Sequence, residues 1–322
     1  MRTCAQLFAL LVLSTPGAAA AAEQDYPNKP IRYITPYAPG GSTSFTARLM
    51  GYRLTEAWGQ QVIVDNRPGA NTMIGMSVAA KSRGDGYTLI SMGNTMVTNH
   101  LLMKTPYDLM KDFTFIATIL SYENVLVVAP TLPANTVKEL VALAKAKPGA
   151  LTYGTSAAGG ATHLLAELLN MQAGIKTRQI PYKGGGPAVS DLMGGHISFF
   201  MSNPANVSSQ IKNGRLRGLA VTGESRTAAF PEVPTFAEEG LPGMTLTNWQ
   251  GVGGPAGIPK RIVEKISGEI KKIVAMPDTK EKLNAQGFEP YYNGPAETAA
   301  IIKSDIAKYG KIIREASIKG EL

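Results

Sequence analysis

The stretch Thr35-Pro-Tyr-Ala-Pro-Gly-Gly-Ser-Thr43 joins a strand-like run to the start of a helix-like run, and Tyr153-Gly-Thr-Ser-Ala-Ala-Gly-Gly-Ala-Thr162 does the same further along the chain. Glycines in such a loop let the backbone approach a ligand closely. The first N–H groups of the following helix have no partner inside the helix, and the helix dipole favours negative charge there. The two loops therefore predict two halves of one site for an acidic molecule.

The composition is that of a globular protein with a large core. Of 322 residues, 44% are hydrophobic and 7% are aromatic, which excludes disordered and collagen-like classes. The net charge is +8, but no basic run is longer than a pair such as Lys271-Lys272. This excess indicates a solvated surface with a mild attraction for anions. Without a basic stripe interleaved with aromatic residues, nucleic acid is not an expected partner.

The first 22 residues have the pattern of a secretory signal peptide. Arg2 supplies a short positive region, residues 7–13 are apolar, and residues 18–22 offer small side chains for cleavage. The apolar region is much shorter than the roughly 20 residues of a membrane-spanning helix. We therefore expect residues 1–22 to be removed near Ala22 and the remaining chain to be exported.

Strand-like and helix-like patterns alternate along the rest of the chain, and the alternation restarts near residue 151. The expected strands are 31–35, 61–65, 87–91, 124–129, 151–155, 177–181, 197–201, 216–222 and 246–253. The expected helices are 42–58, 74–82, 137–146, 161–172, 187–193 and 208–212, with two more after residue 253. Strands separated by single helices predict parallel pairing through crossovers, and hence an α/β fold with two lobes.

The order of these patterns also predicts how the lobes are connected. The chain leaves the first lobe near Asn124 and can return near Leu246, so we expect two crossing segments. The expected boundaries are 23–125 plus 247–322 for lobe 1, a discontinuous α/β domain, and 126–246 for lobe 2. The first helix after residue 253 has isoleucines on one face and lysines and glutamates opposite, which predicts that it packs on a lobe.

Seven short segments, in their order and spacing, resemble the TctC or Bug family, the periplasmic solute-binding proteins of tripartite tricarboxylate transporters. They are Tyr26-Pro-Asn-Lys-Pro-Ile31, Pro36-Tyr-Ala-Pro-Gly-Gly-Ser-Thr43, Val64-Asp-Asn-Arg-Pro-Gly-Ala70, Asp85-Gly-Tyr-Thr-Leu89, Lys111-Asp-Phe113, Pro181-Tyr-Lys-Gly184 and Pro231-Glu-Val-Pro-Thr235. The resemblance implies a two-lobed, type II-like periplasmic-binding-protein (Venus flytrap) fold. Its lobes would be joined by a β-strand hinge and would close on a ligand in the cleft.

The resemblance also implies that a ligand carboxylate lies between the two strand-to-helix loops, held partly through ordered water. Backbone N–H groups and hydroxyls would bind it without a dedicated arginine. The ligand-binding residues transferred in this way are Ala38, Gly40, Gly41, Ser42 and Thr43 from lobe 1 and Thr155, Ser156, Ala157, Gly159 and Thr162 from lobe 2.

Further candidates lie around these loops. Tyr37 stands where phenylalanine is usual in the family. Its hydroxyl could bond a distal polar group of the ligand; the alternative is that the side chain only packs. Tyr182, before Gly184-Gly-Gly186, either packs on the ligand or belongs to a flexible loop. Asn94, in an expected loop, and Asn203 follow strands, at the edge where open α/β sheets bind ligands; the alternative is that they are turn residues.

Two serines, Ser44 and Ser202, stand where many family members carry aspartates. In members that bind amino acids, a cleft aspartate can pair with the ammonium group of the ligand. A desolvated ammonium group without a counter-charge is costly. The sequence therefore predicts a small carboxylic acid without an amino group as the ligand.

Catalytic, metal and cofactor chemistry are not expected. The three histidines, His100, His163 and His196, lack the spacing of metal ligands, and the single cysteine, Cys4, lies in the predicted signal peptide. The sequence contains no Gly-x-Ser-x-Gly elbow, and its glycine loops carry neither a P-loop lysine nor a Gly-x-Gly-x-x-Gly fingerprint. A binding receptor without catalytic residues, metal or cofactor is thus predicted, with a secreted hydrolase as the less favoured alternative.

The expected partners of this receptor are the membrane subunits of a tripartite tricarboxylate-type transporter. A membrane sensor protein that recognises the closed, liganded receptor is the alternative, and the sequence leaves both open. We expect the receptor itself to be a monomer.

Overall fold

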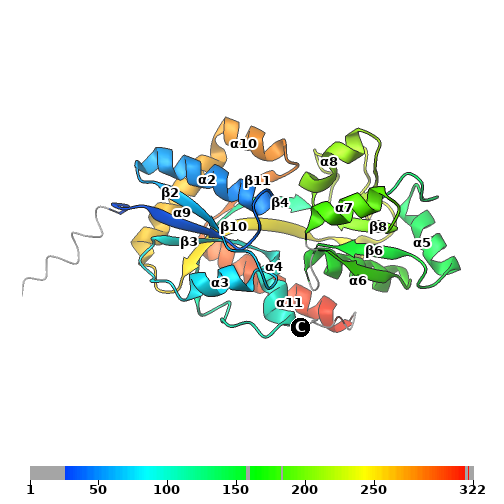
Figure 1. Ribbon diagram of the computed structural model, residues 1–322, viewed down its shortest axis with the longest axis horizontal. Coiled ribbons are helices and arrows are strands. Elements are labelled where there is room, and N and C mark those ends of the chain that lie inside the picture. The colour runs from blue at the N-terminus through cyan, green and yellow to red at the C-terminus, as the bar shows by residue number, and fades with distance from the viewer. Residues whose placement is uncertain (1–25, 157–159, 183, 316–317, 319–322) are drawn as a thin grey trace, which may run out of the picture.

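The computed structural model describes residues 26–156, 160–182, 184–315 and 318. Two β-sheets lie side by side, each flanked by helices (Figure 1). The first sheet contains β1 (Ile31–Thr35), β2 (Val62–Asn66), β3 (Thr88–Gly93), β4 (Phe113–Glu123), β10 (Thr247–Pro255) and β11 (Glu289–Asn293). The second contains β5 (Val125–Val128), β6 (Thr152–Thr155), β7 (Arg178–Pro181), β8 (Phe199–Ser202) and β9 (Arg217–Val221).

The helices are divided between the two sheets. The helices around the first sheet are α2 (Ser42–Trp58), α3 (Met73–Ala80), α4 (Asn94–Leu102), α9 (Lys260–Ala275), α10 (Pro277–Asn284) and α11 (Pro295–Glu315). Those around the second are α5 (Val137–Ala146), α6 (Ala161–Ala173), α7 (Gly185–Met193), α8 (Pro204–Lys212) and the 3-10 helix η1 (Pro242–Met244). None of the helices in the described ranges is long and apolar enough to cross a membrane.

The two sheets repeat one plan. In the first, β1 pairs in parallel with β2 and β3, and β10 lies antiparallel between β3 and β4. In the second, β6 pairs in parallel with β7 and β8, and β5 lies antiparallel between β8 and β9. The predicted parallel pairing is therefore confirmed for three strands of each sheet. It is wrong for β9, because β5 enters from the first lobe and separates β9 from β8.

Two crossings connect the lobes, and one buried hydroxyl ties them together. β4 passes into β5 through Asn124, and the chain returns to β10 through Leu246. The hydroxyl of Thr222 accepts a hydrogen bond from the Asn124 N–H at 3.0 Å and donates one to the Leu246 carbonyl at 2.7 Å. The crossings thus lie where the sequence places them, whereas the exact lobe boundaries remain a prediction.

The core explains why the amphipathic helix after residue 253 forms. Ile266 and Ile270 of α9 and Met50 and Leu54 of α2 are all fully buried in one apolar cluster over the first sheet. The polar face of α9 remains outside. The prediction that this helix packs on a lobe is confirmed.

Five elements were not expected from the sequence: β4, α4, η1, β11 and a third C-terminal helix, since α9, α10 and α11 replace the two expected ones. Helix α4 begins directly after β3, so Asn94 does not lie in a loop as expected. Asparagine, threonine and valine give α4 low helix propensity. Burial of Met96 and Val97 and hydrogen bonds from the Asn99 amide to Asn71 and Thr72 stabilise it instead.

Candidate functional site

A small cavity of about 40 Å³ lies between the two lobes. Most of its wall comes from the lobe of the first sheet, and the first residue of α6 closes it from the other lobe. The lining residues are Tyr37, Thr43, Met92, Gly93, Asn94, Thr95, Tyr122, Ala161, Asn248, Trp249 and Gln250. The lining set contains no acidic, basic or histidine side chain. The preference of the cavity for a positive or a negative ligand therefore depends on backbone and hydroxyl dipoles.

Three helices begin at this cavity. Thr43 lies in the first turn of α2, Thr95 in the first turn of α4, and Ala161 is the first residue of α6. Each helix follows a glycine, which has no side chain with which to cap the free N–H groups. Three helix dipoles with their positive ends at one cavity favour an anion there. The sequence predicted two of these termini and missed α4.

The glycine loop of lobe 1 is held from β2. The Asn66 amide donates hydrogen bonds to the Tyr37 carbonyl at 2.8 Å and to the Ser44 hydroxyl at 3.2 Å. Ala38, Gly40 and Gly41 form the exposed part of the loop. Ser44 is buried against Asn66 and does not line the cavity. Its replacement of an aspartate therefore has no direct effect on the lining charge.

Tyr37 and Tyr122 both belong to the cavity wall. Burial raises the pKa of Tyr37, and the neighbouring Thr95 side chain opposes this shift. Burial and the neighbouring Tyr37 raise the pKa of Tyr122, and the Asn203 side chain of the other lobe opposes this shift. The Asn203 side chain also caps α8, since its Oδ1 accepts the Ala205 N–H at 2.9 Å. Tyr122 and Asn203 thus lie close to each other from the two lobes beside the cavity.

The glycine loop of lobe 2 is closed by hydroxyls. The Ser156 N–H donates to the Thr162 hydroxyl at 3.0 Å, and the two hydroxyl oxygens lie 3.2 Å apart. The Thr155 hydroxyl accepts from the Gln179 amide at 3.0 Å. These bonds bring the end of β6 onto the first turn of α6. The predicted ligand residues Ala157 and Gly159 lie outside the described residues.

Tyr182 and Ser202 do not line the cavity, and their side chains are engaged within lobe 2. The Tyr182 hydroxyl donates to the Asp191 carboxylate at 2.6 Å, and burial together with this carboxylate raises the pKa of Tyr182 to about 12. Ser202 is fully buried and donates to the Asn203 carbonyl at 3.1 Å. Their assignment as ligand contacts stays a prediction that this geometry does not favour.

Asn94 lines the cavity, but its side-chain amide forms hydrogen bonds to residues of the protein behind the cavity wall. Its Oδ1 accepts the Trp249 backbone N–H at 2.9 Å, and its Nδ2 donates to the Tyr309 hydroxyl at 2.6 Å. The Trp249 indole N–H donates to the Asp305 carboxylate at 2.8 Å, and burial raises the pKa of this carboxyl group. Helix α11 therefore fixes the start of α4 and the middle of β10.

No residue of β10 was predicted to belong to the site, yet three of its residues line the cavity. Asn248 is fully buried, and Gln250 is 5% exposed. The Gln250 Nε2 donates to the Ser42 hydroxyl at 3.4 Å, and the Asn248 Nδ2 donates to Asn124 at 3.2 Å. The amide oxygens of both residues lack a hydrogen-bond partner. The available signal was the pair of amides in a strand whose other residues, apart from Thr247 at its start, are apolar or glycine.

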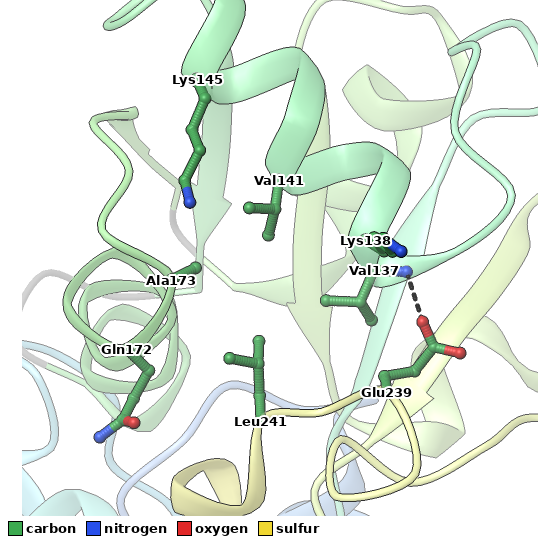
Figure 2. Close-up of a pocket in the computed structure, with 8 residues that line it drawn as sticks. All are labelled: Val137, Lys138, Val141, Lys145, Gln172, Ala173, Glu239 and Leu241. Carbon is green, nitrogen blue, oxygen red and sulfur yellow. Dashed lines mark hydrogen bonds between the residues drawn. The ribbon is translucent and has the colours of Figure 1, made fainter.

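A larger groove of about 230 Å³ lies on lobe 2, away from this cavity (Figure 2). Val141 and Leu241 form an apolar floor, with Lys145 at its edge. The N-terminus of α5 beside it is already occupied, because the Glu239 carboxylate accepts the Val137 N–H at 3.0 Å. This groove offers no free helix terminus to an anion. In the part of the chain that the structure describes, no group of three histidine, cysteine, aspartate or glutamate side chains could hold a metal ion.

Comparison with known proteins places this architecture in a family. The model of the TctC family, described as the tripartite tricarboxylate transporter family receptor, matches residues 46–318. The chain belongs to the TctC family. It is 36% identical over 313 residues to protein BugT of Bordetella pertussis, with 96% of each chain covered.

Two solved structures are similar along almost the whole TctC chain. R. palustris Rpa4515 with adipate is 33% identical, has a TM-score of 0.87, and is matched over 91% of this chain and 99% of its own. A periplasmic transporter is 36% identical, has a TM-score of 0.85, and is matched over 92% and 100%. The two-lobed periplasmic-binding-protein fold is thereby confirmed. The protein is a solute-binding receptor of the TctC type and not an enzyme.

Proposed function

We propose that this TctC receptor captures a small carboxylic acid between its lobes and delivers it to the membrane subunits of a tripartite tricarboxylate-type transporter. The observation that carries the proposal is the meeting of three uncapped helix N-termini at one interlobe cavity. Free N–H groups at positive dipole ends are suited to a carboxylate. The adipate bound by the relative Rpa4515 supports the same ligand class.

The lining also supports an acid without an amino group. Among the described residues that line the cavity, none carries a carboxylate that could pair with an ammonium group. The nearest candidate, Asp305, is bonded behind the wall to the Trp249 indole. Because a desolvated ammonium group without a partner is costly, an amino acid would bind weakly. Ser44 and Ser202, from which the same ligand class was predicted, do not line the cavity.

Delivery requires export and movement between open and closed forms. Removal of residues 1–22 would leave a periplasmic receptor, in agreement with the periplasmic protein to which it is similar. We propose that residues 23–125 plus 247–322 move against residues 126–246 about the two crossings tied by Thr222. Closure brings the start of α6 over the termini of α2 and α4.

A thermal-shift screen of the mature chain tests the proposal. Mono-, di- and tricarboxylates are added separately, and a bound acid at 100 times its Kd stabilises the fold by about 2.7 kcal/mol. Gly41→Asp should abolish this shift, since it places a carboxylate at the start of α2. A β-carbon at Gly41 meets only the Ala38 carbonyl at 3.9 Å, so the variant should fold.

Gly268→Asp is the matched control. Gly268 lies in α9, away from the cavity, and a β-carbon there has no neighbour within 4 Å. It should keep the full ligand shift. A shift that survives Gly41→Asp, or a screen in which no carboxylic acid stabilises the wild type, would contradict the proposed function.

A further inference from the structure

We infer that Gln250 recognises a hydroxyl group of the bound acid, so that the ligand of this receptor is a hydroxycarboxylic acid. This inference rests on the proposed function and adds a residue and a ligand group to it. Gln250 lies on β10, the strand that returns from lobe 2, and lines the interlobe cavity. It is not part of either glycine loop but contacts the lobe 1 loop at Ser42.

The hydrogen bonds of Gln250 are incomplete inside the protein. Its Nε2 donates to the Ser42 hydroxyl at 3.4 Å, while its Oε1 has no partner. The residue is only 5% exposed, so bulk water does not serve this oxygen. A buried amide oxygen without a partner is unfavourable. A hydrogen-bond donor on the ligand would give the Gln250 Oε1 the partner that it lacks.

The rest of the wall offers mainly donors. The starts of α2, α4 and α6 present N–H groups, and these suit the carboxylate oxygens. The unpartnered amide oxygens of β10, on Gln250 and Asn248, are acceptors. A carboxylate at the helix ends with a hydroxyl toward β10 would satisfy both kinds of group. An ammonium group is disfavoured there, because the lining carries no negative charge.

The Ser42 contact supports this orientation of the amide. When the Gln250 Nε2 donates to Ser42, the Ser42 hydroxyl keeps its own proton for the ligand carboxylate, which is a charge-assisted hydrogen bond. In the reversed orientation, Ser42 would donate to Oε1 and Nε2 would face the ligand. The reversed amide would favour a keto group or a second carboxylate in place of a hydroxyl, which gives the test its second arm.

The test uses pairs of acids that differ by one hydroxyl: propionate with lactate, butyrate with 3-hydroxybutyrate, and succinate with malate. Kd values for the mature wild type are measured by calorimetry. The hydroxylated member of each pair that binds should bind about tenfold more tightly, the effect of one buried hydrogen bond and the acceptor it satisfies. Gln250→Met, which keeps the side-chain length, should reduce this ratio to about one.

Two further variants separate recognition from stability. Gln250→Glu supplies a negative charge at the same position and should reverse the preference for malate over aspartate, in which an ammonium group replaces the hydroxyl. Thr279→Val is the control, because Thr279 is also fully buried with an unpartnered oxygen, but lies on α10 away from the cavity. It should leave the ratio of every pair unchanged.

Several results would overturn the inference while the proposed function stands. The wild type could bind acids without a preference for the hydroxylated member, or could prefer a keto acid such as pyruvate over lactate. The preference could survive in Gln250→Met, or this variant could lose affinity equally for both members of a pair, which would mean a purely structural role. If no acid of any kind binds the wild type, the proposed function fails, and this inference fails with it.

Discussion

Helices α5 and α6 lie in the same lobe, and the protein treats their first turns in opposite ways. At α5, the Thr136 hydroxyl accepts the Glu139 N–H at 3.1 Å, and the Glu239 carboxylate accepts the Val137 N–H at 3.0 Å. At α6, Gly160 precedes the helix and has no side chain to offer. The protein thus places its own carboxylate on α5. At α6 we propose that the ligand supplies the equivalent group.

The comparison shows that a missing cap alone does not define a site. Helix α9 also begins without a side-chain cap, after Pro259, and it does not contact the cavity. The feature that distinguishes α2, α4 and α6 is that their free termini meet at one cavity between lobes. Closing the lobes then assembles donors that no single helix provides.

The largest expected effect on stability follows from removing the two side chains, Thr136 and Glu239, that accept hydrogen bonds at the start of α5. The double variant Thr136→Ala with Glu239→Gln should lower the free energy of unfolding by about 2 kcal/mol, since each group stabilises the first turn of α5 by about 1 kcal/mol. The Kd of the ligand acid should not change. Urea unfolding measures the first quantity and calorimetry the second. A large loss of ligand affinity would mean that α5 is not independent of the cavity.

A smaller effect of opposite sign is expected at α2. Gly41→Asp should raise the unfolding free energy of the ligand-free protein by a few tenths of a kcal/mol, because an aspartate caps a helix slightly better than glycine. Gly41 has extended backbone angles of −81° and 169°, which an N-cap aspartate adopts without strain. Urea unfolding of Gly41→Asp and Gly41→Asn compares a charged with a neutral cap. Destabilisation by both would show that the loop needs glycine for its shape.

The sequence predicted the parts of the site that depend on local pattern. Glycine loops followed by hydroxyl residues mark the starts of α2 and α6, and both lie where they were expected. The segment resemblance gave positions but not side-chain directions. Tyr182 and Ser202 therefore entered the expected site, although one bonds Asp191 and the other bonds the Asn203 carbonyl within lobe 2.

The parts that the sequence missed depend on distant contacts. Gln250 meets Ser42 only because β10 returns from the second lobe, and the two residues are 208 positions apart in the chain. Helix α4 forms through burial and through bonds from Asn99 to the loop after β2, against its own weak propensity. Local patterns carry no information on such pairings.

The most direct test of the central claim is a crystal structure of the mature receptor with the acid that gives the largest thermal shift. We predict that the ligand carboxylate accepts hydrogen bonds, directly or through one water, from backbone N–H groups in the first turns of both α2 and α6. No arginine or lysine side chain should contact it. A carboxylate held by a basic side chain, or bound in the groove beside α5, would contradict the account.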